Sequence, residues 1–205
     1  MSPTYQYYFD QVDDDVFVNT EQVWKTLESS HLYSSSMTIE RKDGALVNTN
    51  LDYAIIGHVM HTVPIRDPAS KWFLPIEFYP LNIFPAFTSG TAYIFTGSLV
   101  NSFLHCVLRT PFINLEDVFL TGLCATTQLG LRLTHNPSFV WRPMAVGGSH
   151  TCYFKQSVTV HGSTPEHMEE VWARTQDHHL CDSILFSTMT AASRVIEFVR
   201  NIFRI

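Results

Sequence analysis

Residues 12–18, Val-Asp-Asp-Asp-Val-Phe-Val, set three consecutive carboxylates between β-branched and aromatic side chains. Residues 5–12 are rich in Tyr, Phe and Val, which predicts a buried strand that ends at the acidic run. Adjacent carboxylates in that position are costly unless a cation or another partner neutralises them. Carboxylate oxygens favour a hard divalent metal ion. The run therefore predicts a metal site, and the alternative is a turn that is acidic without function.

A helix is expected directly after the acidic run. Asn19 is a good N-cap residue, and Gln22 stands three residues further along, as in a capping box. Strand, acidic turn and helix together predict a β-to-α unit with its carboxylates at the carboxyl end of the strand. In open α/β sheets, ligands bind at that edge.

Composition indicates a globular protein and argues against a nucleic-acid partner. The chain has 205 residues, of which 45% are hydrophobic and 13% aromatic, enough to build a core. Its formal net charge is −6, and no cluster of Lys and Arg offsets it. No apolar run reaches the length of a membrane span, and the first residues do not form a signal peptide. The four cysteines match no zinc-site spacing, so two disulfides and four thiols both remain open.

The rest of the chain predicts short elements and irregular loops. Residues 34–50 suggest a loop or a hairpin with its turn at Asp43-Gly44, and residues 53–85 suggest irregular structure because they contain five prolines. Periodicity and capping signals predict four further helices: 98–108, with its six apolar residues on one face; 115 to Gly130; one that begins at Thr164-Pro165; and an amphipathic helix over 183–205.

Two more groups are candidates for chemistry. Glu116 and Asp117 lie at a predicted helix start, where the helix macrodipole favours ionised carboxylates. They are either ordinary helix-start charges or a general base. His161 ends the alternating run 158–160, and a lone histidine there is more often structural than a ligand. No Gly-x-Ser-x-Gly is present, which argues against a serine hydrolase of the α/β type.

Five segments in order resemble the β-1,3-glycosyltransferase family, which includes galactosyl- and N-acetylglucosaminyltransferases of the secretory pathway. They are residues 11–19 with the acidic run; 57–73, with Gly-His-Val, Pro-Ile-Arg-Asp and Lys-Trp-Phe; 84–93, Phe-Pro-Ala-Phe-Thr-Ser-Gly-Thr-Ala-Tyr; 115–124, with Leu-Glu-Asp-Val, Gly and Cys; and 160–172, with Val-His-Gly, Pro, Met and Trp. The family usually has Tyr where Phe84 and Phe87 stand and often Cys where Thr88 stands, so acceptor recognition is expected to differ.

The resemblance implies an α/β fold of the GT-A-like, Rossmann type. In that family the nucleotide-binding half of the sheet comes well before the acidic run. We therefore expect residues 1–173 to be the C-terminal part of a catalytic domain without the N-terminal half of its sheet, and residues 174–205 to be a C-terminal extension.

The resemblance also implies a function. The implied activity is that of an inverting hexosyltransferase, which moves galactose or N-acetylglucosamine from a UDP-sugar to a glycan acceptor. The acceptor is expected on a glycoprotein or glycolipid, and the new linkage is expected to be β-1,3. The expected place is the lumenal side of the Golgi membrane, through an anchor that this chain does not contain.

Roles for single residues follow from the same resemblance. Asp117 is the expected base, and Asp15 and His161 are the expected ligands of Mn²⁺ across the UDP phosphates. Asp13 is expected at the ribose or beside the metal, with Asp14 in support. The substrate is expected to contact four further residues, which are Trp72, Ser89, Gly90 and Glu116.

Two alternatives belong to other classes of function. The chain could be a non-catalytic remnant that binds or assembles with a full-length transferase, because the strand over residues 5–12 would lack sheet neighbours and expose an apolar edge. It could also be an unrelated metal-dependent hydrolase built on the acidic run. That second alternative leaves the other four ordered segments unexplained.

Overall fold

The computed structural model describes residues 8–29, 37–40, 46–49, 54–143 and 151–176, and it is a mixed α/β structure. Its strands are β1 (Tyr8–Val12), β2 (Val16–Val18), β3 (Met37–Glu40), β4 (Leu46–Thr49), β5 (Ile55–Met60), β6 (Phe87–Thr96), β7 (Thr134–His135), β8 (Phe139–Val140) and β9 (Thr159–His161). Its helices are α1 (Thr20–Ser29), α2 (Leu99–Val107), the π-helix η1 (Val118–Gln128), α3 (Thr151–Gln156) and α4 (Pro165–Thr175).

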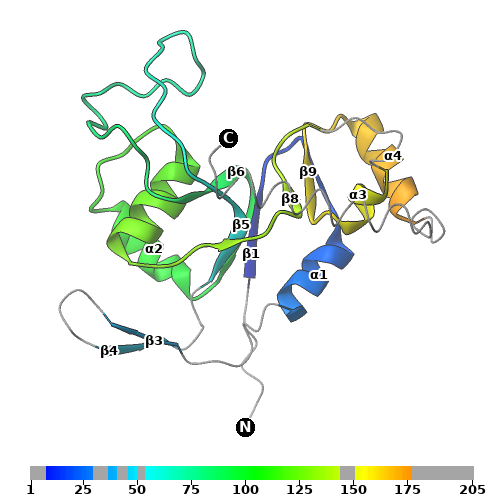
Figure 1. The fold of residues 1–205 in the computed structure, drawn as a ribbon, viewed down its shortest axis with the longest axis horizontal. Helices are drawn as coiled ribbons and strands as arrows, with labels where there is room; N and C mark the ends of the chain where they lie inside the picture. The colour runs from blue at the N-terminus through cyan, green and yellow to red at the C-terminus, as the bar shows by residue number, and fades with distance from the viewer. Residues whose placement is uncertain (1–7, 30–36, 41–45, 50–53, 144–150, 177–205) are drawn as a thin grey trace, which may run out of the picture.

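The larger of two lobes is built on a four-stranded sheet in the order β1-β6-β5-β7. β6 pairs antiparallel with β1 and β5, while β5 and β7 run parallel. The helices α2 and η1 cover one face of this sheet (Figure 1). The buried cluster between them joins residues of both layers: Ile55, Tyr93, Leu99, Phe103, Cys106, Cys124 and Ala125.

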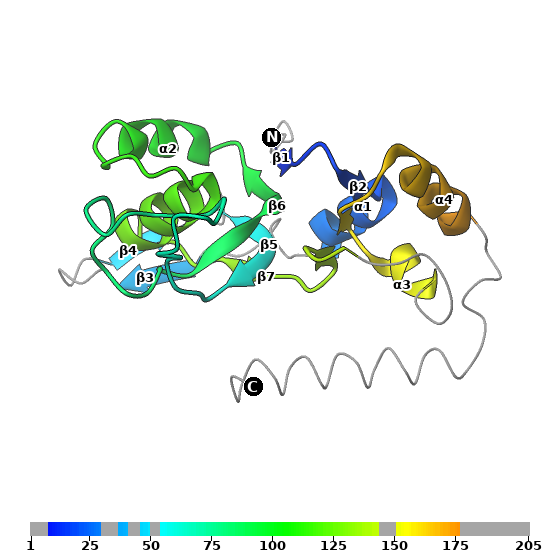
Figure 2. The same cartoon turned by 90° about the horizontal axis from the view of Figure 1, so that it is seen from above.

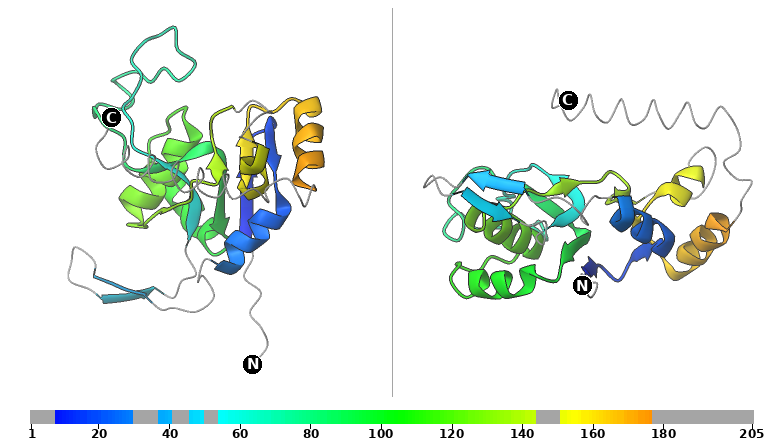
Figure 3. Two further views of the ribbon diagram at one scale, coloured as in Figure 1. Left: turned by 45° about the vertical axis from the view of Figure 1, so that its right-hand side comes forward. Right: turned by 90° about the horizontal axis from the view of Figure 1, so that it is seen from below.

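The smaller lobe carries the three-stranded sheet β2-β9-β8 together with α1, α3 and α4 (Figures 2 and 3). β2 and β9 are antiparallel, and β8 and β9 are parallel. One buried cluster spans both lobes, with Ile56, Ala92 and Ile94 from the larger sheet against Val16 and Phe139 from the smaller one. The two sheets therefore share a core and hold each other in place.

The acidic run forms the connection between the two sheets. β1 ends at Val12 and β2 begins at Val16, so residues 13–15 make the turn that leads from one lobe into the other. The prediction of a strand followed directly by a helix is wrong in this respect. Val-Phe-Val at residues 16–18 suits a strand, and it pairs with β9 before α1 begins.

β1 is not the fully buried strand that its composition suggests. It lies at the edge of its sheet among the described residues, paired with β6 on one side only. Val12 is 38% exposed. The expectation that this strand lacks sheet neighbours is therefore wrong, because β6 pairs with β1 along its whole length, and the other edge of β1 has no partner strand among the described residues.

Asn19 and Thr164 are N-cap residues, as the sequence predicts. The second bond of a capping box at α1 is not formed, because the Gln22 side chain donates to the Lys155 carbonyl and the Asn19 N–H donates to the Val158 carbonyl. The Gln22 N–H donates to Asn19 Oδ1 over 3.3 Å at the start of α1, and the His167 N–H donates to Thr164 Oγ1 over 3.2 Å at the start of α4. The predicted face of the 98–108 helix is partly wrong. α2 buries Leu99, Phe103 and Cys106, and its other apolar residues face solvent: Val100, Leu104, Val107 and Leu108.

The predicted helix from 115 to Gly130 is present with a different hydrogen-bond pattern. It is a π-helix over Val118–Gln128 with Asp117 as its N-cap residue. Gly130 follows the end of the helix with φ of +67°, the left-handed conformation expected after a helix C-terminus. A mid-chain π-helix is rare, and such turns often accompany functional sites.

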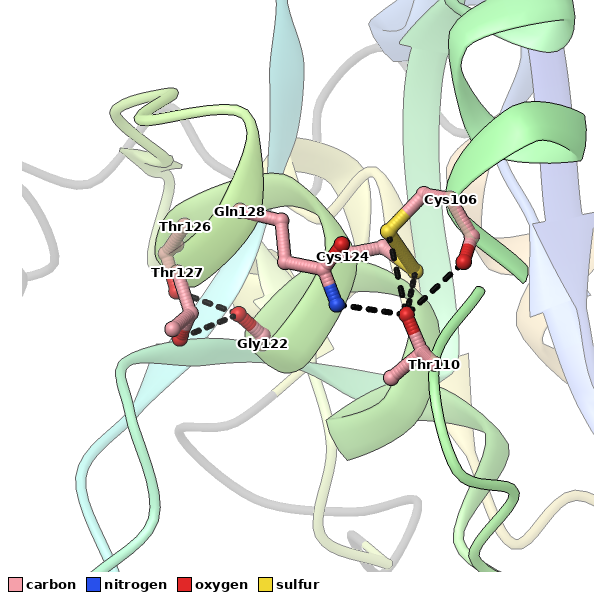
Figure 4. The surroundings of a disulfide bond; sticks show 7 residues. All are labelled: Cys106, Thr110, Gly122, Cys124, Thr126, Thr127 and Gln128. Carbon is pink, nitrogen blue, oxygen red and sulfur yellow. Dashed lines mark hydrogen bonds between the residues drawn. A yellow bond between two sulfur atoms is a disulfide. The ribbon is translucent and has the colours of Figure 1, made fainter. Parts of the chain in front are cut away.

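A disulfide between Cys106 and Cys124 ties α2 to η1 (Figure 4). Of the two alternatives left open for the cysteines, the structure supports a disulfide for this pair. The Thr110 hydroxyl lies beside both sulfur atoms and accepts a hydrogen bond from Gln128 Nε2 over 2.6 Å. Cys181 lies outside the described residues.

The predicted irregular segment follows β5 and continues to β6. Arg66 holds it together by donating to the carbonyls of Leu74, Tyr79 and Leu81. The predicted hairpin is present as β3 and β4, while Asp43-Gly44 and the amphipathic segment 183–205 lie outside the described residues. None of the described helices combines the length and the apolar character needed to cross a membrane.

Candidate metal and carboxylate site

Three side chains that the sequence singles out meet at the junction of the two lobes. One potential ligand atom from each of Asp13, Asp15 and His161 lies within 4.8 Å of the other two. The His161 Nε2 is 3.4 Å from the Asp15 Oδ2. In the described part of the chain, these residues form the one group of three or more His, Cys, Asp or Glu side chains with that spacing.

The backbone fixes each of these side chains. The Asp13 N–H donates to the Thr91 carbonyl over 3.1 Å, which extends the β1–β6 pairing by one residue into the turn. The Ser163 N–H donates to the Asp15 carbonyl over 2.8 Å. His161 stands opposite Val16 in the β2–β9 pair, so the strand register itself brings the histidine to the turn.

Gly162 is required directly after His161. Its φ is +73°, and a Cβ atom there would lie 2.7 Å from Pro143 Cγ. A side chain would therefore be strained and would also clash with Pro143. The glycine lets the chain turn away from β9 immediately after the histidine.

The carboxylates of the turn repel one another. Burial is the main cause that raises the pKa of Asp13 above its ordinary value, and the charges of Asp15 and Asp14 raise it further. His161 and Lys71 act in the opposite direction. The group thus has an excess of negative charge that a bound cation would relieve.

The donor set fits a divalent metal ion. Two carboxylates and one imidazole suit Mn²⁺ and related ions. Ligands at about 2.1–2.4 Å from one ion lie at most about 4–5 Å apart, and the three atoms satisfy that limit. The His161 Nδ1 is buried and has no hydrogen-bond partner among the described residues. The Nε2 lies beside Asp15, so the imidazole ring is available to a metal ion that Asp15 would also bind.

Glu116 and Asp117 form a second group at the amino end of η1. Asp117 Oδ1 accepts the Val118 N–H over 2.8 Å, and its Oδ2 accepts the Gly90 N–H over 3.1 Å. The Tyr93 hydroxyl donates to Glu116 Oε1 over 2.6 Å. Strand β6 and helix η1 therefore hold both carboxylates in defined positions.

Burial dominates the electrostatics of this second group. It raises the pKa of Asp117 above its ordinary value, although the hydrogen bonds from Val118 and Gly90 act to lower it. The backbone N–H groups thus favour the ionised form of Asp117, as the helix start predicts, but burial has the larger effect on its pKa. Burial also raises the pKa of Glu116, and the nearby charge of Asp13 raises the pKa of both residues. The two groups also lie beside adjacent residues of β6, since Asp13 bonds to the Thr91 carbonyl and Asp117 to the Gly90 N–H.

The sequence over residues 1–137 matches the profile of the family described as Galactosyltransferase. That match covers more than half of the chain. The chain belongs to the galactosyltransferase family.

Individual relatives agree with this family. The chain is 32% identical over 166 residues to "Beta-1,3-galactosyltransferase 1" of Mus musculus, which is 80% of the chain and 44% of that relative, and the same values hold for the Homo sapiens protein. It is 35% identical over 116 residues to "Beta-1,3-galactosyltransferase 5" of Homo sapiens, which is 55% of the chain and 36% of that relative. The chain thus spans less than half the length of the curated relatives it matches.

The other predicted site residues of this galactosyltransferase-family chain lie at different depths. Ser89 is buried and its hydroxyl lies 3.1 Å from that of Thr91, while Gly90 contacts Asp117 directly. Trp72 is 53% exposed. Asp14 is exposed and lies outside the group of Asp13, Asp15 and His161.

Two residues near the site were not predicted as site residues. Lys71 stacks its ammonium over the Trp72 ring at 4.4 Å from the centroid, and its charge acts on Asp13. Tyr93 donates to Glu116. Both residues lie inside segments that carry the family resemblance, which could have marked them as candidates. Their residue types alone did not predict that they lie near the carboxylates.

Proposed function

We propose that this chain carries the metal-binding and acceptor-activating part of an inverting β-1,3-glycosyltransferase with a GT-A-like fold. The observation that carries the proposal is that β6 joins the group of Asp13, Asp15 and His161 to Asp117. The Asp13 N–H donates to the Thr91 carbonyl, and the N–H of the preceding residue, Gly90, donates to the Asp117 carboxylate. The donor is a UDP-sugar, with galactose favoured because the similar proteins named above are β-1,3-galactosyltransferases. The acceptor is a hydroxyl of a glycan.

Asp117 is the base in this proposal. Its raised pKa makes it a stronger proton acceptor than an ordinary aspartate, while two backbone N–H groups keep its oxygens in place. A carboxylate oxygen of Asp117 takes the proton of the acceptor hydroxyl while the oxygen of that hydroxyl bonds to the anomeric carbon. The bond from the anomeric carbon to the phosphate oxygen breaks on the opposite face, and UDP leaves with the electron pair.

Asp13, Asp15 and His161 would hold the divalent ion, with Mn²⁺ as the expected species. Bound there, the ion would neutralise the charge that develops on the leaving diphosphate. Asp14 would support the turn. Glu116, fixed by Tyr93, is suited to accept a hydrogen bond from a sugar hydroxyl, while Ser89, Gly90 and Trp72 would line the sugar or acceptor position.

The setting of the whole enzyme is part of the proposal. By analogy with its family, the protein would act on the lumenal side of the Golgi membrane on glycoproteins or glycolipids. The domain division at residue 173, with residues 174–205 as an extension, stays a prediction.

The decisive experiment is the substitution Asp117→Asn in the natural full-length protein. Asn keeps the shape but accepts no proton, so kcat should fall by about 10²–10⁴-fold. Binding of UDP in the presence of Mn²⁺ should stay within about twofold, because Asp117 is not one of the three residues in the group that could hold the metal. Transfer from radiolabelled UDP-galactose measures the first quantity, and isothermal titration calorimetry measures the second.

Two outcomes would contradict the proposal. Unchanged turnover in Asp117→Asn would remove the base. Absence of UDP binding by the unsubstituted protein with Mn²⁺ present would favour the alternative of a non-catalytic chain that assembles with a full-length transferase.

A further inference from the structure

Thr121 links the strand and the helix that hold Asp117. Its side chain is fully buried, one turn into η1. The Thr121 hydroxyl donates to the Asp117 carbonyl over 2.6 Å and accepts the Thr88 N–H over 2.9 Å. Thr88 lies two residues before Gly90 on β6, the residue whose N–H donates to the Asp117 carboxylate. Two hydrogen bonds therefore join β6 to the start of η1. The first runs from the Thr88 N–H to the Thr121 hydroxyl, and the second from the Gly90 N–H to the Asp117 carboxylate.

The second of these hydrogen bonds lies at an unusually tight contact. A Cβ atom on Gly90 would lie only 3.2 Å from the Cβ and 3.3 Å from the Oδ2 of Asp117. The backbone of β6 thus lies so close to the aspartate that a side chain at position 90 would be crowded. A small displacement of the helix start would lengthen the Gly90 hydrogen bond, and the Thr121 hydroxyl, which bonds to both the helix start and β6, opposes such a displacement.

We propose that Thr121 is a positioning residue for Asp117, acting through the backbone of β6 and of the first turn of η1. The inference rests on the proposed function, since it names the device that sets the position of the base. Valine has the same shape as threonine but would place a methyl group against the buried Thr88 N–H. That N–H would lose its hydroxyl acceptor, and the Asp117 carbonyl would lose its donor.

Loss of the link has two consequences at the carboxylate. The acceptor hydroxyl and the base lose their alignment, which lowers kcat rather than substrate affinity. The weakened Gly90 hydrogen bond stabilises the ionised form less, so the pKa of Asp117 rises further. The acid limb of the kcat pH profile, which follows ionisation of the base, then moves to higher pH.

The chain offers a matched control for this substitution. Thr126 is on the same helix, and its hydroxyl also donates to a carbonyl four residues earlier, that of Gly122, over 2.6 Å. It also donates to the Ala86 carbonyl over 3.1 Å. Thr126→Val therefore removes a comparable hydrogen bond between a helix hydroxyl and the backbone without touching Asp117. Its stability and kcat show how much of any effect of Thr121→Val comes from general destabilisation.

The experiment compares Thr121→Val, Thr121→Ser and Thr126→Val in the natural full-length protein. We expect kcat to fall about tenfold or more in Thr121→Val with the donor KM unchanged, and the acid limb to move upward. Thr121→Ser, which restores the hydroxyl, should recover most of kcat, and Thr126→Val should behave as the unsubstituted protein. Titration of the carbon-13-labelled Asp117 carboxyl by NMR reports the same pKa change without turnover.

The outcomes separate this inference from the proposed function. Equal behaviour of Thr121→Val and Thr126→Val, both in kcat and in the Asp117 titration, overturns the positioning role while an inactive Asp117→Asn still supports the base. Full turnover of Asp117→Asn overturns the base and the positioning role together. An Asp117 titration that is unmoved by Thr121→Val overturns the inference even if no variant turns over.

Discussion

The two halves of the site are built in opposite ways. On the side of β6 and η1, Asp117 and Glu116 are held by N–H and hydroxyl donors from fixed elements. On the side of the turn between β1 and β2, Asp13 and Asp15 lie close to each other and to a single histidine, and Asp13 is exposed. In the first half, hydrogen bonds hold the carboxylate groups themselves. In the second half, hydrogen bonds hold the backbone, and the negative charges of the aspartates are not balanced by an equal number of positive charges.

The difference teaches where each half obtains its order. In the proposed enzyme the base must be in place before substrate arrives, and a hydrogen-bonded, half-buried carboxylate meets that need. The proposed metal site would have to accept an ion and a diphosphate together, so free oxygen atoms suit it. Substitutions that act on one half and spare the other test this division.

After the loss of turnover expected for Asp117→Asn, the next largest effect is on the metal half. Asp15→Asn removes one of the proposed charged ligands, so affinity for Mn²⁺ should fall about 10-fold to 100-fold. Calorimetric titration with MnCl₂ in the presence of UDP measures it. The control is Asp14→Asn, the same change of charge one residue earlier, which should cost less than about threefold because Asp14 is outside the ligand group.

Equal losses in both variants would mean that net charge of the turn, and not ligation by Asp15, governs the affinity. Retention of full affinity in Asp15→Asn would remove Asp15 from the site. Neither variant should change the Asp117 hydrogen bonds, so residual turnover at saturating Mn²⁺ reports on the base half alone.

The next effect is on the base half. Gly90→Ala introduces a Cβ atom 3.2 Å from Asp117 Cβ, and the aspartate must shift by a few tenths of an ångström. We expect kcat to fall about tenfold, with Mn²⁺ affinity within twofold of the unsubstituted value. Steady-state kinetics and calorimetry measure the two quantities.

Gly122→Ala is the matched control for Gly90→Ala. Its Cβ atom would meet Pro85 and Phe87 at 3.2 and 3.3 Å, an equally tight contact that does not involve Asp117. If both variants lose turnover in parallel with stability, the contact at Gly90 has no special bearing on the base.

The smallest effect concerns stability outside the site. Burial, with the charges of His135 and Arg142, lowers the pKa of His58 from 6.5 to about 4. Below pH 6.5 the unfolded chain takes up this proton first, so stability is full above that pH and is lost as pH falls toward 4. Allowing for partial exposure, we expect His58 to account for about 1 kcal/mol of the stability lost between pH 7 and pH 5.

Urea unfolding of His58→Phe at the two pH values checks this. Phe keeps the ring contacts with His135 and Trp141 and removes the titration, so the pH dependence should shrink by that amount. His105→Phe, at an exposed histidine of α2, should leave the dependence unchanged. A pH dependence that is the same in all three proteins would remove His58 as its source.

Sequence patterns identified the local features of this molecule more readily than its sheets. The cap at Asn19, the cap at Thr164 and the turn of chain at Gly130 each depend on neighbours a few residues away, and each is present. The three clustered candidates Asp13, Asp15 and His161 came from the acidic run and from the family resemblance together, since His161 lies 146 positions after Asp15.

The errors have a common physical cause. Val16 to Val18 became a strand because β9 offers a partner that lies far away in the sequence. The outward face of α2 looked as apolar as its buried face, and the cluster formed with β5, β6 and η1 decides which side is covered. The effect of the Lys71 charge on Asp13 and the hydroxyl link of Thr121 likewise depend on tertiary packing that no local pattern encodes.

The bond between Cys106 and Cys124 has a practical consequence for anyone who prepares this protein. It closes a covalent ring of chain, with the two cysteines 18 positions apart, and Glu116 and Asp117 lie within that ring. Such a ring forms in an oxidising compartment and stays open in a reducing cytosol. Protein from a cytosolic expression host would therefore lack the covalent link between η1 and α2, while the acidic turn at residues 13–15 would be unchanged. Low activity of such a preparation would reflect its reduced cysteines and would not test the roles of the carboxylates.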